Sequence, residues 1–179
     1  QLELSGAPLD NLHETCRETG RHLRHMREAA RPLDIGMLGV GFHPTASRED
    51  ISFMPKGRYG IMSRHMPKVG KLGLDMMLRS CTVQVNLDYM DEADMRQKFR
   101  TSLALQPLAT ALFANSPFKD GQPSGLLSTR AQAWTDTDAA RCGVPACVFD
   151  PYFGYEQWID YILDVPMYFL HRGDDYIDV

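Results

Sequence analysis

The chain has 179 residues, of which 44% are hydrophobic and 23% charged, and a formal net charge of -4. This composition predicts one globular domain with its own hydrophobic core, and it excludes disordered, collagen-like and disulfide-framework proteins. Because 19 basic residues are balanced by 23 acidic ones, no general attraction to nucleic acid or anionic lipid is expected. The longest apolar stretch, residues 102–114, is too short to cross a bilayer.

The start of the chain and its cysteines indicate what kind of polypeptide it comes from and in which compartment it is expected. The sequence begins at Gln1 without a methionine, which we interpret as a sign that it is part of a longer polypeptide. Its four cysteines match no disulfide framework, and the spacing of Cys142 and Cys147 is not that of a zinc knuckle. Free thiols and a cytoplasmic location are therefore expected.

The first predicted element is an amphipathic helix over residues 12–30. Apolar positions recur there at alternating steps of four and three, and Pro32 and Gly36 end the pattern. The next run, residues 35–42, is almost wholly apolar. It predicts a short strand that is buried on both faces.

Residues 81–89, CTVQVNLDY, alternate apolar and polar side chains without a fault. They predict a strand with one face on the core, whose other face presents hydrogen-bonding groups to solvent or to a pocket. Asp91 then caps a long helix that runs to Phe113. The second half of this helix is apolar nearly all round and is expected to be buried.

The rest of the chain predicts shorter elements and lacks familiar enzyme motifs. A loop over 118–125, renewed order over 126–134 and a loop over 136–151 come first. A short helix over 155–163 and a last strand over 165–170 follow. The sequence contains no phosphate loop, HExxH or GxSxG motif.

Polar residues on these elements are the remaining candidates for a site. Glu3 alternates with apolar neighbours as a strand carboxylate does, and Arg58 and Arg130 could each hold a carboxylate or phosphate. Taken singly, each is better explained as a surface residue. The same holds for His22 and His25, which are spaced to share a metal but lie on an arginine-rich helix face. The residues alone therefore predict only an α+β domain with a polar sheet face.

Five long and unusual strings follow one another along nearly the whole chain. They are QLELSGAPL (1–9), MPKGRYGIM (54–62), MPKVGKLGLDMMLRSCTVQVNLDY (66–89), FRTSLALQPLATALFANSPF (99–118) and FGYEQWIDYILDVPMYF (153–169). In these strings the chain resembles the glutamate-cysteine ligases of the plant and proteobacterial type. Their length makes the resemblance highly specific.

The resemblance implies an ATP-dependent ligase. Such an enzyme joins the γ-carboxylate of L-glutamate to L-cysteine through γ-glutamyl phosphate, with Mg²⁺, in the first step of glutathione synthesis. The implied fold is α+β and similar to that of glutamine synthetase, a curved antiparallel sheet with flanking helices. Residues 1–179 would then be a single segment from the central part of a larger catalytic domain, and inactive as a ligase by themselves.

Site residues follow from the same resemblance. Glu3, in QLELSGAP, would be one magnesium ligand, because Mg²⁺ prefers hard oxygen donors. The family's other acidic ligands are expected outside this chain. Gln84 and Asn86, on one face of the predicted strand, would reach the metal-nucleotide or the glutamyl phosphate.

Three further side chains would bind or activate substrate. Arg130, in the family's LSxR stretch, would clamp a glutamate carboxylate. Arg58, in KGRY, would add positive charge near the reacting groups, and Tyr168, in DVPMYF, would line the cysteine pocket. Cys16 matches a cysteine that plant members use for redox control, but Val179 stands where a second is expected, so a plant-style switch is not predicted.

Two other functions remain open at this point. One is a sister ligase of the same fold that joins glutamate to a different amine, and the other is a ligand-binding module without turnover. The expected partners are small molecules, without nucleic acid or membrane, and a homodimer is one assembly we consider. A plastid location would replace the cytoplasmic one in a plant.

Overall fold

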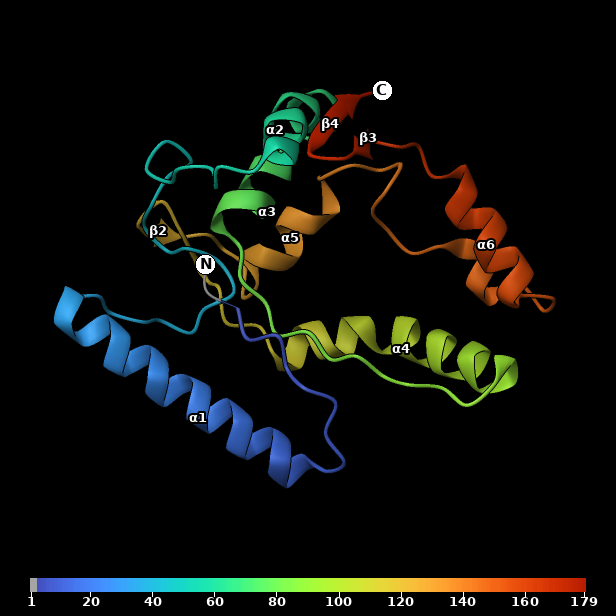
Figure 1. The fold of residues 1–179 in the computed structure, drawn as a ribbon, viewed down its shortest axis with the longest axis horizontal. Coiled ribbons are helices and arrows are strands. Elements are labelled where there is room, and N and C mark those ends of the chain that lie inside the picture. The colour runs from blue at the N-terminus through green and yellow to red at the C-terminus, as the bar shows by residue number, and fades with distance from the viewer. Residues whose placement is uncertain (1–2) are drawn as a thin grey trace. The chain divides into compact units, whose positions relative to one another are not determined.

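A computed structural model describes residues 3–179 of the chain (Figure 1). Its contacts divide the chain into two compact units, residues 1–39 and 40–179. The elements, in chain order, are α1 (Leu12–Ala30), η1 (Arg31–Leu33), α2 (Gly57–Val69), α3 (Gly73–Arg79), α4 (Glu92–Leu112), β1 (Phe118–Lys119), β2 (Gln122–Pro123), α5 (Thr129–Thr135), η2 (Ala146–Phe149), α6 (Tyr155–Asp164), β3 (Phe169–Arg172) and β4 (Asp175–Asp178). No helix among the described residues is long and apolar enough to span a membrane.

The first unit is built around α1, which has the predicted bounds. The Asn11 side chain accepts a hydrogen bond from the backbone N–H of Glu14 at 3.1 Å and so satisfies one of the free donors at the helix start. The Glu18 carboxylate accepts from the backbone N–H of Ala7 at 3.2 Å. This bond ties the segment that precedes α1 to the helix itself.

Two predicted strands are absent from the described part of the chain. Residues 35–42 and 81–89 form no strand there. Phe42 makes one isolated antiparallel bridge, with Ser80, which immediately precedes the second segment. A strand needs a neighbour along its whole length, and neither segment has one among residues 3–179 beyond this bridge. The predictions of these two strands were therefore wrong, and Val83 and Val85 are 90% and 74% exposed instead of half-buried.

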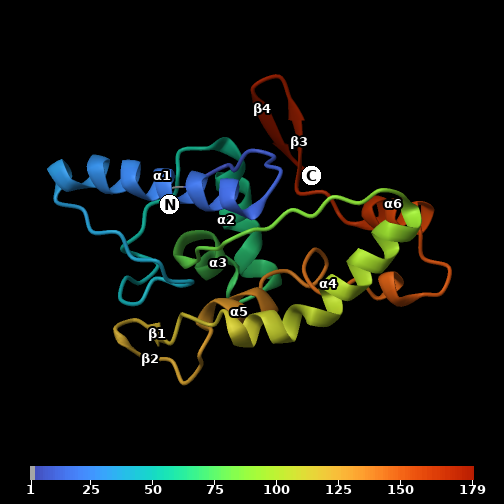
Figure 2. The same cartoon turned by 90° about the horizontal axis from the view of Figure 1, so that it is seen from below.

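The predicted curved sheet is likewise not seen in residues 3–179. The strands present form two antiparallel hairpins, β1–β2 and β3–β4. Figure 2 shows the β1–β2 hairpin beyond the C-terminal end of α4. Mixed helices and small antiparallel sheets confirm the α+β class.

A hydrophobic cluster in the second unit joins α4 to η2 and α6. Met95, Val148 and Phe153 form its buried centre. Phe99 and Trp158 pack against it, with ring centroids 4.8 Å apart and an interplanar angle of 80°. Edge-to-face packing of this kind adds to the free energy gained by burial.

Helix α4 begins at its predicted cap, but its second half is not buried. The Asp91 side chain accepts a hydrogen bond from the backbone N–H of Asp94 at 2.9 Å. The helix then continues through Pro107. Leu108 and Leu112 are 60% and 80% exposed, because no other described element covers that face. The prediction of a buried second half was wrong.

The turn between α2 and α3 makes close backbone contact with the segment after α5. A Cβ added at Gly70 would lie 2.6 Å from the carbonyl oxygen of Asp136 and closer still to that of Thr137. The backbone N–H of Leu72 donates to the Asp136 carbonyl at 2.9 Å. Gly70 is therefore required because no side chain fits in this space. Its backbone conformation does not require glycine, because it is extended and open to any residue.

Helix α6 agrees with the helix predicted over 155–163. The last predicted strand, over 165–170, starts later than predicted: β3 spans Phe169–Arg172. Pro166 has no N–H to donate to a strand partner, and its carbonyl is bound by a side chain described below. Figure 1 shows β4 beside α2, where the Tyr176 ring covers Gly57.

Candidate active site

A buried carboxylate joins three segments of the second unit. Asp138, whose side chain is 1% exposed, follows α5. Its Oδ2 accepts hydrogen bonds from the Tyr168 hydroxyl at 2.9 Å and from Arg141 Nη1 at 2.8 Å. His65 of α2 places its Nε2 3.3 Å from the same oxygen. These four side chains are called the Asp138 cluster below.

Arg141 holds the chain segment that precedes β3. Its Nε donates to the Pro166 carbonyl at 2.9 Å, and its Nη2 donates to the Met167 carbonyl at 3.2 Å. The guanidinium carbon lies 4.0 Å from the centroid of the Tyr168 ring. A planar fork with several fixed donors is suited to such simultaneous contacts, which an ammonium group would not reproduce.

The protonation states in the cluster follow from burial and hydrogen bonding. Burial raises the pKa of Tyr168 to about 12, assisted by the hydrogen bond to Asp138 and by its charge. Burial also favours a raised pKa for Asp138, but the hydrogen bonds from Tyr168 and Arg141 outweigh it and hold the pKa below its usual value. At neutral pH the hydroxyl is therefore a donor and the carboxylate is ionised.

Arg130 lies in the first turn of α5, which begins where the Ser128 side chain accepts from the backbone N–H of Ala131 at 3.1 Å. Its side chain packs against Gly41, and its guanidinium carbon lies 5.8 Å from the Trp134 ring centroid.

The Nε of Arg130 is buried without a hydrogen-bond partner in the described part of the chain. Burial lowers the pKa of Arg130, although an arginine stays charged. A desolvated guanidinium with an open donor favours an incoming anion.

Gln84 and Asn86 are the only two predicted site residues that a hydrogen bond joins within residues 3–179. Gln84 Nε2 donates to Asn86 Oδ1 at 2.9 Å, and both side chains are exposed. The two amides thus lie together as predicted, although on an unpaired segment instead of a strand.

Arg58 and Glu3 are both exposed in the structure. Arg58 occupies the first turn of α2, with its guanidinium carbon 5.3 Å from the centroid of the Tyr59 ring. Lys56 and Tyr59, on either side of it, line an open pocket of about 400 Å³. Glu3 belongs to the first unit and lies in an irregular segment.

A magnesium ion does not fit the described residues by themselves. Across residues 3–179 there is no group of three or more His, Cys, Asp or Glu side chains that could hold a metal. The single carboxylate of Glu3 is too few ligands for a cation that requires octahedral oxygen coordination.

A second buried charge network lies between α3 and the loops around it. Asp75 Oδ1 accepts from Arg79 Nη1 at 3.1 Å, and Asp75 Oδ2 accepts from Arg48. Arg79 Nη2 donates to Asp120 at 2.6 Å. Burial favours a raised pKa for Asp75, but the Arg48 and Arg79 hydrogen bonds and the Arg48 charge hold it below the usual value. Every charge here has an opposite charge beside it, as a structural network requires, although Arg79 Nε itself is buried without a hydrogen-bond partner in the described part of the chain.

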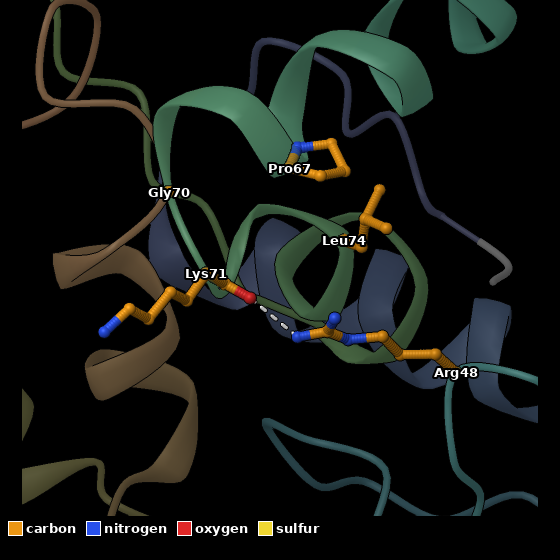
Figure 3. A pocket seen from close by; sticks show the side chains of 5 residues that line it. All are labelled: Arg48, Pro67, Gly70, Lys71 and Leu74. Carbon is orange, nitrogen blue, oxygen red and sulfur yellow. Dashed lines mark hydrogen bonds between the residues drawn. The ribbon is translucent and has the colours of Figure 1, made fainter.

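An open pocket of about 300 Å³ borders this network (Figure 3). It is lined by Arg48, Pro67, Gly70, Lys71 and Leu74. The Arg48 guanidinium is directed at the backbone carbonyl of Lys71, to which Nη2 donates at 2.7 Å, and the Lys71 side chain runs away from Pro67 and Leu74. The Arg48 guanidinium is already bound by this carbonyl and by Asp75, so Arg130 and the Asp138 cluster are the better site candidates.

The sequence analysis did not identify His65, Asp138 or Arg141. The last two lie in the predicted loop over 136–151, where no periodicity marks them. The available signal was the Asp-x-Asp pair in TDTD followed by an arginine. Only the fold brings this run against Tyr168.

Comparison with known proteins gives consistent results along the chain. The family described as Glutamate-cysteine ligase family 2 (GCS2) matches residues 1–178. The chain is 62% identical over 178 residues to the chloroplastic glutamate--cysteine ligase of Arabidopsis thaliana, which covers 99% of this chain and 34% of the relative. The corresponding ligase of Brassica juncea is also 62% identical, with 99% and 35% covered.

A third relative, glutamate--cysteine ligase B, chloroplastic, of Oryza sativa subsp. japonica, is 60% identical over 99% of this chain and 36% of its own length. The chain thus spans about a third of the length of the curated relatives it matches.

Proposed function

The chain belongs to glutamate-cysteine ligase family 2, and on this premise we propose that it forms the central part of the catalytic domain of a ligase joining glutamate to cysteine. The support is an identity of 62% over 99% of the chain to a relative with that name. Because the chain matches only 34% of that relative, the activity is assigned to the longer protein, called the parent protein below.

The proposed reaction has two steps. ATP transfers its γ-phosphoryl group to the γ-carboxylate of glutamate, giving γ-glutamyl phosphate and ADP. The cysteine amine then attacks the acyl carbon and loses a proton, and the C–O bond breaks as phosphate leaves and the amide forms. Both steps spread negative charge over oxygens, so positioning and fixed cations do most of the catalytic work.

Arg130 is the observation that carries this proposal at the level of the site. A half-buried guanidinium with an unpartnered Nε is suited to a carboxylate, which accepts two parallel N–H···O bonds. We assign it to a carboxylate of glutamate. The Trp134 ring, whose centroid lies 5.8 Å from the guanidinium carbon, attracts the cation and so favours one orientation of it.

The other predicted residues keep their proposed roles. Arg58 would neutralise charge near the reacting phosphoryl group, which its exposure at the start of α2 permits. Gln84 and Asn86 would contact the nucleotide or the glutamyl phosphate. Tyr168 would line the cysteine pocket.

Magnesium and its ligand Glu3 remain proposals. A Glu carboxylate is the right donor type, but the remaining ligands would have to come from other parts of the parent protein. No step above depends on the ion.

The deciding experiment measures phosphate release by the parent protein with MgATP and glutamate, with and without cysteine. We expect cysteine-dependent release and a product with the mass of γ-glutamylcysteine. Release with another amine only would indicate the sister ligase. No phosphate release with any acceptor would indicate a binding module without turnover.

Location and assembly are also proposals for the parent protein. The names of the relatives place those proteins in the chloroplast, which supports a plastid location over the cytoplasmic one expected from the free thiols. A fluorescent fusion imaged in plant cells would test it. Light scattering of the parent protein tests the proposed homodimer, which would have twice the mass of one parent polypeptide.

A further inference from the structure

We propose that Asp138 and Arg141 are positioning residues that orient Tyr168, and that they thereby set the selectivity of the ligase for its acceptor amine. This inference rests on the proposed function, in which Tyr168 lines the cysteine pocket. It extends that function to two residues that contact Tyr168 from a different segment of the chain.

The first support is the way in which the Tyr168 segment is held. Tyr168 precedes β3, outside the ladder of the β3–β4 hairpin. The carbonyls of Pro166 and Met167 are instead bound by Arg141 at 2.9 and 3.2 Å. Arg141 is in turn fixed by its ion pair with the buried Asp138 at 2.8 Å. The backbone before Tyr168 is therefore held by side-chain contacts. Arg141, its bonds to the carbonyls of Pro166 and Met167, and its ion pair with Asp138 are called the clasp below.

The second support is the hydrogen bond that the Tyr168 hydroxyl already makes within the protein. It donates to Asp138 at 2.9 Å and stays protonated, because its pKa is about 12. It is thus a poor general base, and its proton is not available for a hydrogen bond to substrate. The hydroxyl fixes the ring, and the partly exposed ring offers an apolar surface to a ligand.

The third support is the orientation of that ring. The Arg141 guanidinium covers it at 4.0 Å, and the His65 ring meets it edge-on, with centroids 4.7 Å apart and an angle of 78°. Tyr168 nevertheless stays partly exposed. A thiol packs favourably against the remaining aromatic surface, and a methyl group does so less well. The clasp therefore favours a thiol side chain in the acceptor.

Arg141→Lys in the parent protein tests the clasp, because lysine retains the charge but cannot bind both carbonyls and cover the ring. We expect the cysteine KM to rise about tenfold, while the KM values for glutamate and ATP change by less than about twofold. The preference for cysteine over 2-aminobutyrate, in which a methyl replaces the thiol, should fall about threefold. Arg24→Lys, on exposed α1, is the matched control and should leave all of these values unchanged.

A double-mutant cycle tests the route through the hydroxyl. Asp138→Asn and Tyr168→Phe each weaken the same contact, so each should raise the cysteine KM, and the double variant should raise it no further than the larger single effect. Multiplying effects would show that the hydroxyl and the carboxylate act separately and would overturn the inference. The Phe and Asn replacements are nearly isosteric, so this cycle remains available if Arg141→Lys fails to fold.

The two proposals fail in different ways. A wild-type parent protein that makes no γ-glutamylcysteine would overturn the proposed function and this inference together. An active wild type whose Arg141→Lys variant has equal changes in all three KM values, or a lower melting temperature alone, would overturn only the inference. An unchanged ratio of cysteine to 2-aminobutyrate would do the same.

Discussion

Replacement of Arg130 by alanine removes the half-buried guanidinium that we assign to glutamate. We expect the parent protein to lose about 2 to 4 kcal/mol of transition-state binding, seen as a large rise in the glutamate KM or as loss of turnover. Steady-state kinetics with glutamate as the varied substrate measure this loss.

The matched control for this prediction is Arg24→Ala. This residue is exposed on α1, so its removal should leave the glutamate kinetics unchanged. Glutamate kinetics that are unaffected by Arg130→Ala would show that the assignment of this arginine is wrong.

Asp75 is expected to make the stability of the parent protein depend on pH. Its folded-state pKa lies below the ordinary 3.8, so the ionised carboxylate stabilises the fold above that value. As the pH falls from about 4 through the folded pKa, the carboxylate takes up a proton and this stabilisation is lost. Denaturation of wild type and Asp75→Asn along a pH series measures the effect, and the stability difference should narrow below about pH 4.

At neutral pH, Asp75→Asn is expected to cost about 3 kcal/mol, because it leaves the buried Arg79 with less compensating charge. Asp94→Asn makes the same chemical change at the exposed ion pair with Lys98 and should cost far less. Equal losses in the two variants would contradict the structural role of the buried network.

Among the elements, α4, η2 and α6 depend on the cluster around Phe153. Phe153→Ala removes a fully buried ring and should lower the free energy of unfolding by about 3 to 5 kcal/mol. Chemical denaturation of the parent protein measures this change. Phe149→Ala, in the neighbouring η2, removes a half-exposed ring and should cost clearly less. A larger loss at Phe149 would contradict the described packing.

The helices α1, α4 and α6 could be predicted from the sequence, because their signals are local. A cap such as Asn11 or Asp91 and a period near 3.6 lie within a few residues of one another. The strand over 81–89 has an equally clear local pattern. Pairing, however, requires a distant partner, and no alternation along one segment reveals whether that partner is there.

The same distinction explains what could be predicted of the candidate site. Tyr168 was found through a long string that resembles a family, and Arg130 through its residue type and the family's short LSxR stretch. Arg130 proved to be a half-buried cation. His65, Asp138 and Arg141 were missed, because α2, the segment after α5 and the start of β3 meet only in the fold. Their spacing in the sequence has no period that would indicate a shared contact.

For the molecule as a whole, the unpaired segment 81–89 predicts self-association of the isolated chain. Its valines are exposed, and within residues 3–179 its backbone pairs with no strand, which favours pairing between chains. Light scattering of the isolated chain should show growth of assemblies with concentration. Val83→Lys with Val85→Lys should suppress that growth by placing charges on the apolar positions.

Thr82→Lys with Gln84→Lys is the matched control. It adds the same charge at alternate positions but leaves both valines in place, so it should suppress association less. Equal suppression by the two pairs would mean that net charge, and not the apolar row, controls association.

The crowding around Gly70 limits which amino-acid substitutions the chain can accept during evolution. Two carbonyl oxygens occupy the volume that any side chain would need there, whereas Gly121 has open space around it and is restricted by its φ of +76°. Saturation mutagenesis under selection for activity should therefore reject every substitution at position 70, alanine included. Position 121 should accept asparagine, which adopts left-handed backbone more readily than other residues. Two glycines that look alike in the sequence would then have opposite evolutionary freedom, one limited by its neighbours and the other by its own backbone.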